Sequence, residues 1–398
     1  MKILLINAVS GRGSTGKICF DLCETLMRQG HECRIAYGRD PVPEAAQKVS
    51  VRIGSQTSVK IDALKTRLFD NAGFNSRRAT KKFLKWVDFF QPDVIHLHNL
   101  HGYYVHVGML FDYLKAHREI KVVWTLHDCW AFTGHCVYFD YVQCEKWKSA
   151  CAKCPQKKQY PKSVFRDRSA KNYLQKKECF TGHRNMTIVT PSEWLKELAK
   201  QSFLSEYEIE VVPNGIDTNV FCPTESDFKE RNGLAEKKIV LGVANIWDKR
   251  KGMEDFLALS KILPEEYKTV LVGVSGKQRK KLPQSVLGLG RTNGAKELAG
   301  IYTAAEVFFN PTYEDNFPTV NLEALSCGTP VICYRTGGAT EMLTEKNGIV
   351  LEKGNYEGVP EMLPQAEKLR QTAAENENFR ENYSQEKMCE RYIRLYNE

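Results

Sequence analysis

Short apolar runs recur along the first half of the chain, and stretches with helical periodicity separate them. Runs of this kind, bounded by turn residues, are typical of buried parallel strands. The predicted strands are Lys2–Asn7, Glu32–Tyr37, Val51–Ile53, Val94–His98, Val122–Leu126 and Thr187–Thr190. The predicted helices are Lys17–Gln29, Ala79–Phe90 and Glu193–Lys200, the last with Ser192 as its N-cap. This alternation predicts a doubly wound α/β sheet.

The same pattern restarts after the turn-rich Pro213-Asn214-Gly215. Its predicted strands are Ile239–Ala244, Thr269–Val274, Val307–Asn310 and Val331–Tyr334. Two such halves predict two Rossmann-like domains that face each other across a cleft, with ligands at the carboxyl ends of the strands. We expect domains at 1–210 and 211–378, followed by a helical, aromatic-rich stretch at 379–398.

Length and composition fit this division. The chain has 398 residues, 42% of them hydrophobic and 26% charged, as in globular proteins of two ordinary domains. No apolar run approaches the roughly 18 residues needed to span a bilayer. The apolar start is short and leads into a glycine loop, so we interpret it as a strand and not as a signal peptide. We therefore expect a cytoplasmic protein.

The positive charge is unevenly distributed. Lysine and arginine exceed aspartate and glutamate by 57 − 48 = 9, and much of the excess lies between Lys146 and Arg184. Two interpretations stay open, a solvated basic face and a patch that faces anionic lipid.

A cluster of four cysteines lies within an insertion at about residues 129–165, namely Cys136, Cys144, Cys151 and Cys154. Four thiols that end in a C-x-x-C are able to hold a structural zinc ion. Disulfides or unligated packing are the alternatives.

The loop Gly11–Gly16 follows the first strand and has the G-x-G-x-x-G spacing of a dinucleotide site. The spacing is a weak signal, because that site also needs an acidic residue after the second strand, where Arg39 stands. A phosphate-binding P-loop is excluded because Ile18 replaces the hydroxyl residue that would hold magnesium. A plain turn that starts a helix is the remaining alternative.

Histidines end two of the predicted strands. Alternation puts His96 and His98 on one face, without carboxylate partners that would favour a metal site. Recognition of a ligand by His98 and Asn99 is the preferred hypothesis. His127 ends another strand, where a buried structural histidine is the alternative to a functional one.

The segment Pro311–Ile332 carries the most informative pattern. Asp315 and Glu323 lie eight positions apart, with Asn316 as the expected N-cap of a new helix. The first backbone N–H groups of that helix, at Thr319 and Val320, would form a phosphate site. A diphosphate site with an acid on either side suits a nucleotide sugar.

This pair resembles the Glu-x7-Glu signature of family 4 retaining glycosyltransferases, with Asp315 at the first position and Glu314 beside it. The resemblance implies the GT-B fold and a terminal helix that returns to the first domain. It implies a reaction on one face of the sugar, with no conventional nucleophile and no catalytic cofactor or metal. The family clamps the diphosphate with an arginine and a lysine; Lys251 fits, whereas Asn245 takes the arginine position and leaves Lys249 or Arg250 to supply that charge.

The resemblance thereby implies three sets of site residues. The catalytic set is His127, Asp315 and Glu323. The donor-binding set is Gly13, Asn245, Arg250, Lys251, Glu314, Asn316, Phe317, Pro318, Thr319 and Val320. The acceptor-binding set is Gly16, His98, Asn99 and His101.

The runs His127–Trp130 and Cys151–Gln156 look like those of bacterial enzymes that build capsule, O-antigen or exopolysaccharide. That resemblance implies a lipid-linked glycan acceptor, a nucleotide-diphosphate sugar donor and a peripheral position on the anionic inner membrane. The rival hypotheses are an NAD-dependent oxidoreductase that uses the Gly11–Gly16 loop and a zinc-stapled nucleic-acid-binding protein. The paired acids have no use in nucleic-acid binding, so we expect no nucleic-acid partner.

Overall fold

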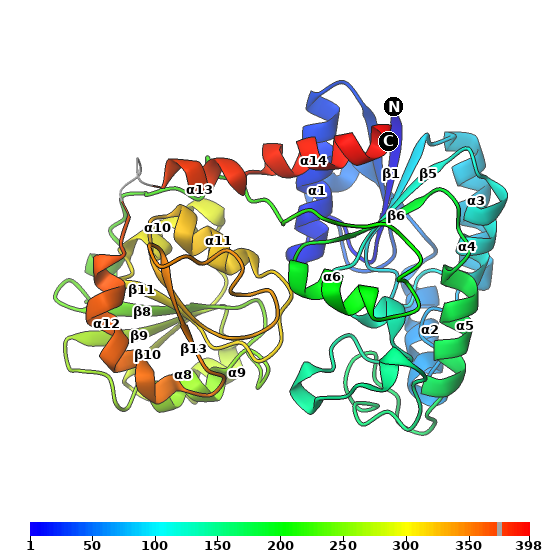
Figure 1. Cartoon of the computed structure of the whole chain (residues 1–398). Coiled ribbons are helices and arrows are strands. Elements are labelled where there is room, and N and C mark those ends of the chain that lie inside the picture. Colours follow the sequence, from blue (N-terminus) through cyan, green and yellow to red (C-terminus); the bar gives the residue numbers. More distant parts are fainter. Residues whose placement is uncertain (372–375) are drawn as a thin grey trace. The chain divides into compact units, whose positions relative to one another are not determined.

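The structure is a computed structural model that describes residues 1–371 and 376–398 (Figure 1). Its contacts divide the chain into two compact units. Unit 1 comprises Met1–Pro213 and Met388–Glu398, and unit 2 comprises Asn214–Lys387.

Unit 1 is built on a seven-stranded sheet with the order β3-β2-β1-β4-β5-β6-β7. All of its strand pairs are parallel. The strands are β1 (Lys2–Asn7), β2 (Glu32–Tyr37), β3 (Ser50–Arg52), β4 (Val94–Leu97), β5 (Lys121–Thr125), β6 (Met186–Thr190) and β7 (Ile209–Val211). The α-helices are α1 (Gly13–Arg28), α2 (Gln56–Phe69), α3 (Arg77–Phe90), α4 (Val107–Ala116), α5 (Ser169–Phe180) and α6 (Glu193–Lys200).

Alternate residues of the central strand enter two separate cores. Leu4 and Ile6 of β1 pack in one core, whereas Ile3 and Leu5 pack in the other. Because successive side chains of a strand point to opposite faces, both faces of the sheet are covered. This burial on both sides explains why the strands read as continuous apolar runs.

Unit 2 repeats the plan with six parallel strands in the order β10-β9-β8-β11-β12-β13. The strands are β8 (Lys238–Val243), β9 (Tyr267–Val272), β10 (Val286–Leu289), β11 (Val307–Asn310), β12 (Val331–Tyr334) and β13 (Gly348–Leu351). The helices are α7 (Phe228–Arg231), α8 (Met253–Leu259), α9 (Gly276–Arg279), α10 (Ala295–Ala304), α11 (Thr319–Ser326), α12 (Val359–Lys368) and α13 (Glu377–Asn382). The prediction of two Rossmann-like sheets is confirmed.

Short 3-10 turns complete both units. They are η1 (Glu44–Val49), η2 (Trp130–Phe132), η3 (Asp140–Val142), η4 (Lys146–Lys148) and η5 (Tyr356–Gly358). The cysteine-rich insertion thus has little regular structure of its own.

Helix α14 (Gln385–Asn397) carries the end of the chain onto the sheet of unit 1. Its Tyr396 hydroxyl is hydrogen-bonded to Nδ1 of His96, 2.7 Å away, and the imidazole Nε2 is 2.7 Å from the hydroxyl of Thr125. Tyr392 reaches the same threonine at 2.9 Å. His96 is therefore a buried structural histidine that ties the terminal helix to β4 and β5.

Two sequence predictions of element limits were wrong. The terminal stretch is not one helix, because α13 ends at Asn382 and Ser384 forms an isolated bridge with Ile216 before α14 begins. The first helix begins at Gly13 and not at Lys17, so Gly13 and Gly16 lie in its first turn. Ser192 is the N-cap of α6 as predicted, and its hydroxyl accepts a hydrogen bond from the Leu195 N–H.

Among the residues described, we find no helix whose length and apolar character would let it cross a bilayer.

We expect Tyr396→Phe to lower the free energy of unfolding by about 1–3 kcal/mol, because it leaves a buried imidazole nitrogen without its partner. Urea denaturation measures the change. The control is Tyr356→Phe, whose half-buried hydroxyl has no hydrogen-bond partner in the described part of the chain. Equal stability of the two variants would contradict the structural role of His96.

Candidate functional site

Most of the predicted site residues follow strands that border a reversal in strand order, and His127 follows β5, the next strand beyond β4. In unit 1 the reversal lies between β1 and β4, and in unit 2 between β8 and β11. At such a point the loops that follow neighbouring strands diverge and leave room for a ligand. The candidate residues are therefore grouped by topology in both units.

In unit 2, α11 begins at Thr319 with Pro318 at the N-cap position. The prediction of Asn316 as N-cap was wrong, because the extended Pro318 takes the N-cap position and no side chain of the described residues caps the helix. The backbone N–H groups of Thr319 and Val320 have no acceptor among the described residues. Phe317 is held by its carbonyl, which accepts a hydrogen bond of 3.0 Å from Asn214. The first turn of α11 thus presents two free N–H donors.

Both acids of the pair have defined partners. Asp315 forms an ion pair with the ammonium group of Lys251. Tyr302 donates a 3.0 Å hydrogen bond to Glu323. Burial is the main cause that raises the pKa of the Tyr302 phenol, and the negative charge of Glu323 raises it further. The structure brings Lys251 to Asp315 and orients Glu323 through a buried tyrosine.

The loop that carries Lys251 packs directly on the segment that follows β11. A Cβ at Gly252, where φ is +70°, would lie 2.3 Å from the Pro311 carbonyl oxygen, so only glycine fits this approach. Arg250 donates from Nη1 to the Glu314 carbonyl at 2.9 Å, and its own carbonyl accepts from the Tyr313 N–H. Arg250 therefore fastens the two loops together beside the buried Glu314.

Sequence reasoning missed Arg291, which follows β10. Its guanidinium donates a 2.7 Å hydrogen bond to Oδ1 of Asn245, the residue at the position where an arginine was expected. The two residues are 46 positions apart in the sequence, and no motif joins them. Only the adjacency of β8, β9 and β10 brings this cation to Asn245.

In unit 1, the predicted histidines meet at the ends of β4 and β5. Nδ1 of His98 lies 2.9 Å from Nε2 of His127, and the two rings are stacked. Burial lowers the pKa of His127 to about 4, and it also lowers the pKa of His98. Nε2 of His98 is buried without a hydrogen-bond partner in the structure as described. An orphan nitrogen of this kind marks a place for a water or ligand hydroxyl.

His101 belongs to a second set of contacts beside His127. Its Nε2 lies 2.7 Å from Asp128, and its Nδ1 lies 3.2 Å from the Tyr160 hydroxyl. Burial alone raises the pKa of Asp128, but His101 and the Trp130 N–H outweigh it and hold the pKa below its usual value. No sequence motif pointed to Tyr160, which reaches this site from the cysteine-rich insertion.

The remaining unit 1 candidates lie around β1. The N–H of Asn99 donates to Oδ1 of Asn7 at 3.2 Å, and Asn7 donates in turn to the Val9 carbonyl at 2.8 Å. Asn7 was not predicted and joins the loops after β1 and β4. Gly16 is buried so closely that a Cβ would lie 2.9 Å from the Val9 side chain, whereas a Cβ at Gly13 would meet nothing within 4 Å. Gly13 is thus the more open of the two predicted glycines.

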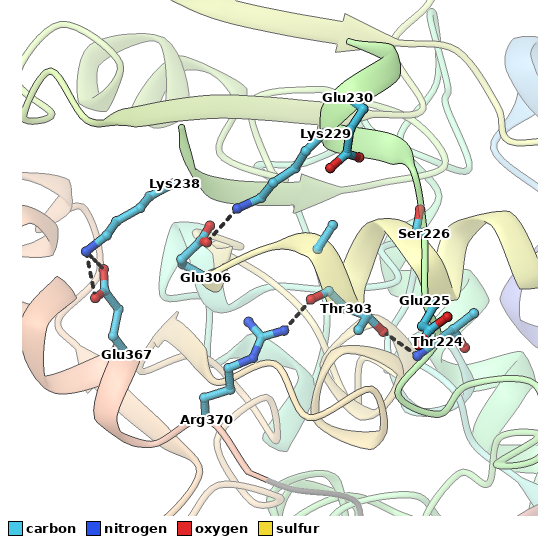
Figure 2. Close-up of a pocket in the computed structure, with 11 residues that line it drawn as sticks. Thr224, Glu225, Ser226, Lys229, Glu230, Lys238, Thr303, Glu306, Glu367 and Arg370 are labelled. Carbon is cyan, nitrogen blue, oxygen red and sulfur yellow. Dashed lines mark hydrogen bonds and ion pairs between the residues drawn. The ribbon is translucent and has the colours of Figure 1, made fainter. Parts of the chain in front are cut away.

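A hollow of about 640 Å³ lies at the opposite, amino edge of the unit 2 sheet (Figure 2). Lys238 is the first residue of β8, and Glu306 precedes β11. Four charged side chains of the hollow form two ion pairs, Lys238 with Glu367 and Lys229 with Glu306 (Figure 2). These ion pairs join strand starts to α7 and α12, so we assign the hollow a structural role.

The four cysteines of the predicted zinc site surround one small cavity. Cys136, Cys144, Cys151 and Cys154 all line it, together with His135. All four are free thiols. Hydrogen bonding from Cys136 lowers the pKa of Cys154 to about 7. Within residues 1–371 and 376–398, no group of three or more His, Cys, Asp or Glu side chains is arranged to hold a metal ion. Zinc binding stays a prediction, and elemental analysis of the reduced protein is the measurement that tests it.

Comparison with solved structures identifies the architecture. Sucrose-phosphate synthase from Thermosynechococcus elongatus superposes with a TM-score of 0.71 at 17% identity, covering 100% of this chain and 98% of that one. Anabaena Alr3699/HepE, solved in complex with UDP, gives a TM-score of 0.68 at 14% identity, and both chains are covered completely. With the two parallel sheets, these similarities confirm the predicted GT-B fold.

Sequence comparison gives a consistent result. WcaC of Escherichia coli (strain K12), provisionally named as a colanic acid biosynthesis glycosyl transferase, is 24% identical over 416 residues, covering 100% of this chain and 99% of WcaC. The model described as Glycosyl transferases group 1 matches residues 224–386. The model of Glycosyltransferase Family 4 matches residues 15–220, more than half of the chain. The chain belongs to Glycosyltransferase Family 4.

Proposed function

We propose that this glycosyltransferase moves a hexosyl group from a nucleoside-diphosphate sugar to a lipid-linked glycan, with retention at the anomeric carbon. The observation that carries the donor assignment is the start of α11, where two free N–H groups follow Asp315 of the acid–lysine pair by four and five residues and precede Glu323 by one turn. A helix N-terminus attracts anions through its N–H groups and its dipole. A nucleoside diphosphate has the charge for such a position.

The donor residues divide between phosphate and sugar in this proposal. The Thr319 and Val320 N–H groups and the Lys251 ammonium bind the diphosphate, while Glu323 accepts hydrogen bonds from ribose hydroxyls. Asp315 accepts from the hydroxyls of the transferred sugar. Structures of Anabaena Alr3699/HepE contain UDP and UDP-glucose, which supports a nucleotide-sugar donor for a chain of this fold.

The proposed reaction breaks the bond between the anomeric carbon and the β-phosphate oxygen and forms a bond from that carbon to an acceptor hydroxyl oxygen on the same face. The leaving diphosphate takes the acceptor proton. Lys251 and the helix N–H groups stabilise the charge that develops on the diphosphate. His98, Asn99 and His101 are the proposed acceptor contacts, and the unpaired Nε2 of His98 is available for a hydroxyl.

The acceptor and the cellular location of the enzyme are proposed from its net charge and from its sequence similarity to WcaC. The chain carries a formal net charge of +9, which suits an anionic lipid-linked acceptor at the inner face of the plasma membrane. Its similarity to WcaC supports a role in surface polysaccharide synthesis. A thermal-shift panel of UDP-, GDP- and dTDP-sugars identifies the nucleotide, because a ligand that binds the native state raises its melting temperature.

We expect Glu323→Gln to weaken donor binding by roughly 10- to 100-fold and to abolish turnover, because a neutral amide replaces the charged acceptor of the ribose hydroxyls. The variant keeps an oxygen for the Tyr302 hydroxyl and should remain folded. Calorimetric titration with the donor identified by the panel measures the loss. The control Glu361→Gln changes an exposed glutamate of α12. Donor affinity equal to that of the control would contradict the ribose assignment.

We expect Arg291→Ala to weaken binding of the free nucleoside diphosphate by roughly tenfold, because it removes the guanidinium beside Asn245. Adding Asn245→Arg to this variant should restore most of the affinity, since it returns a guanidinium to the same place. Arg279→Ala, an exposed cation of α9, is the matched control. Unchanged affinity of Arg291→Ala, or no recovery in the double variant, would exclude Arg291 from the phosphate clamp.

We expect the buried His127 to make stability depend on pH between its ordinary value of 6.5 and its folded pKa of about 4. Between these two pH values the unfolded chain binds a proton that the native site does not bind, so the free energy of unfolding falls as the pH falls. Above pH 6.5 this contribution is constant. His127→Gln should reduce the slope by up to about 1.4 kcal/mol per pH unit. Urea denaturation across this range measures it, and an unchanged slope would mean that the imidazole protonates in the native state.

A further inference from the structure

Helix α2, labelled in Figure 1, carries apolar side chains at exposed positions. Ile61 is 50% exposed, Leu64 57% and Phe69 41%. Ile61, Leu64 and the half-buried Leu68 occupy positions i, i+3 and i+7, which form one stripe along a helix. The stripe that normally faces a core therefore faces away from it in α2.

The cause is that α2 directs its acids inward. Asp62 is buried and accepts hydrogen bonds from Ser76 at 2.5 Å and Asn75 at 3.0 Å. Asp70, the C-cap of α2, is buried against His135 and the Arg168 N–H. Because this polar network fixes the rotation of the helix, the apolar stripe has no position other than the surface.

A second segment adds to the stripe. Val164 is 50% exposed and Phe165 72%. The Val164 N–H donates 2.8 Å to the carbonyl of Arg67 in α2, and the Arg166 guanidinium lies 5.5 Å from the centre of the Phe69 ring. The two segments are thus fastened side by side. We call Ile61, Leu64, Phe69, Val164 and Phe165 the docking face.

Exposed cations accompany these apolar side chains. They are Lys60, Lys65, Arg67, Lys162 and Arg166, and we include them in the docking face. The one acid within α2 is the buried Asp62, and Asp167 on the second segment is engaged by the N–H groups of Cys154 and Ser169. Lys176 of the predicted basic stretch does not contribute, because it is buried and donates to the Trp130 and Thr133 carbonyls. The docking face is therefore strongly basic as well as apolar.

The start of α2 borders a basic hollow of about 510 Å³. Arg52, Arg78 and Lys82 line it beside Trp86, and its described lining contains no carboxylate. Such a hollow has the charge to receive a phosphate-bearing headgroup. It extends the basic character beyond the docking face itself.

The docking face is also linked through the chain to the acceptor residues. Tyr160, which hydrogen-bonds His101, precedes Val164 by four residues, a span of at most about 14 Å. A bilayer bound at Val164 would therefore lie within about 14 Å of Tyr160, the residue that contacts His101.

We propose that the docking face binds the surface of an anionic lipid bilayer, with its apolar side chains at the headgroup boundary and its cations on the lipid phosphates. Apolar side chains interspersed with lysine and arginine are the composition of interfacial helices. A second copy of the chain fits less well, because two equally basic faces would repel each other. This inference rests on the proposed function for its lipid-linked acceptor, and it names the surface that brings the enzyme to that acceptor.

Co-sedimentation with phosphatidylcholine vesicles, with and without phosphatidylglycerol, tests the proposal on the full chain. The wild type should bind the mixed vesicles, and rising salt should weaken that binding. Leu64→Asp/Phe165→Asp should bind at least about tenfold more weakly, because it places charges at the headgroup boundary. Lys65→Glu/Arg67→Glu should lose a similar factor on mixed vesicles.

The matched controls lie in unit 2, where Ile262→Asp and Lys261→Glu change an exposed apolar and an exposed basic side chain. Binding of the docking-face variants equal to that of these controls, or no vesicle binding by the wild type, would overturn the proposal. So would a wild-type dimer in sedimentation velocity that Leu64→Asp/Phe165→Asp dissociates without changing vesicle binding. A donor-induced thermal shift that persists in any of these cases would leave the donor assignment intact and reject only the docking face.

Discussion

The parallel pairing of the strands, with one reversal of order in each sheet, is the constraint on which the arrangement depends. It sends the loops after β1 and β4 in unit 1, and those after β8 and β11 in unit 2, to the carboxyl edge beside a reversal. The strands are buried on both faces and supply the rigidity, while the loops supply the chemistry. Asn7 illustrates the division, since it ends a core strand and fixes the neighbouring loop through the Asn99 N–H.

Charge balance governs the residues around α11. The Lys251 ammonium is already paired with Asp315, so a diphosphate has to share this cation with a carboxylate. The free N–H groups at Thr319 and Val320 offset that competition, because they carry partial positive charge and no acid lies in the first turn of α11. Arg291 is a further cation whose guanidinium is held by the neutral Asn245, and no carboxylate of the described residues pairs with it. An arginine that no carboxylate neutralises attracts a phosphate more strongly than one in an ion pair.

The fold and the donor segment were predictable because their signals are local. Apolar runs specify β11 and β12, and the residues Pro318 and Thr319 mark a helix start to within a few positions. Arg291 and Tyr160 were not predictable, since each reaches its partner, Asn245 or His101, through tertiary structure. The break after Asn382 was missed for the same reason, because the bridge from Ser384 to Ile216 leaves no pattern in the aromatic-rich terminal stretch.

Helix α2 shows how a buried polar network can create a function at the surface. Exposing Ile61 and Leu64 costs less free energy than leaving the hydrogen-bonding partners of Asp62 and Asp70 without their carboxylates, and this difference orients α2. Asp62 and Asp70 have partners only in their present positions, so the apolar stripe has to face outward. Exposed apolar area is normally kept small on a monomer, and here cations surround it. The network that orients α2 also fastens it to the segment that includes Tyr160 and Val164, so the same contacts that expose the apolar stripe set its distance from the acceptor residues.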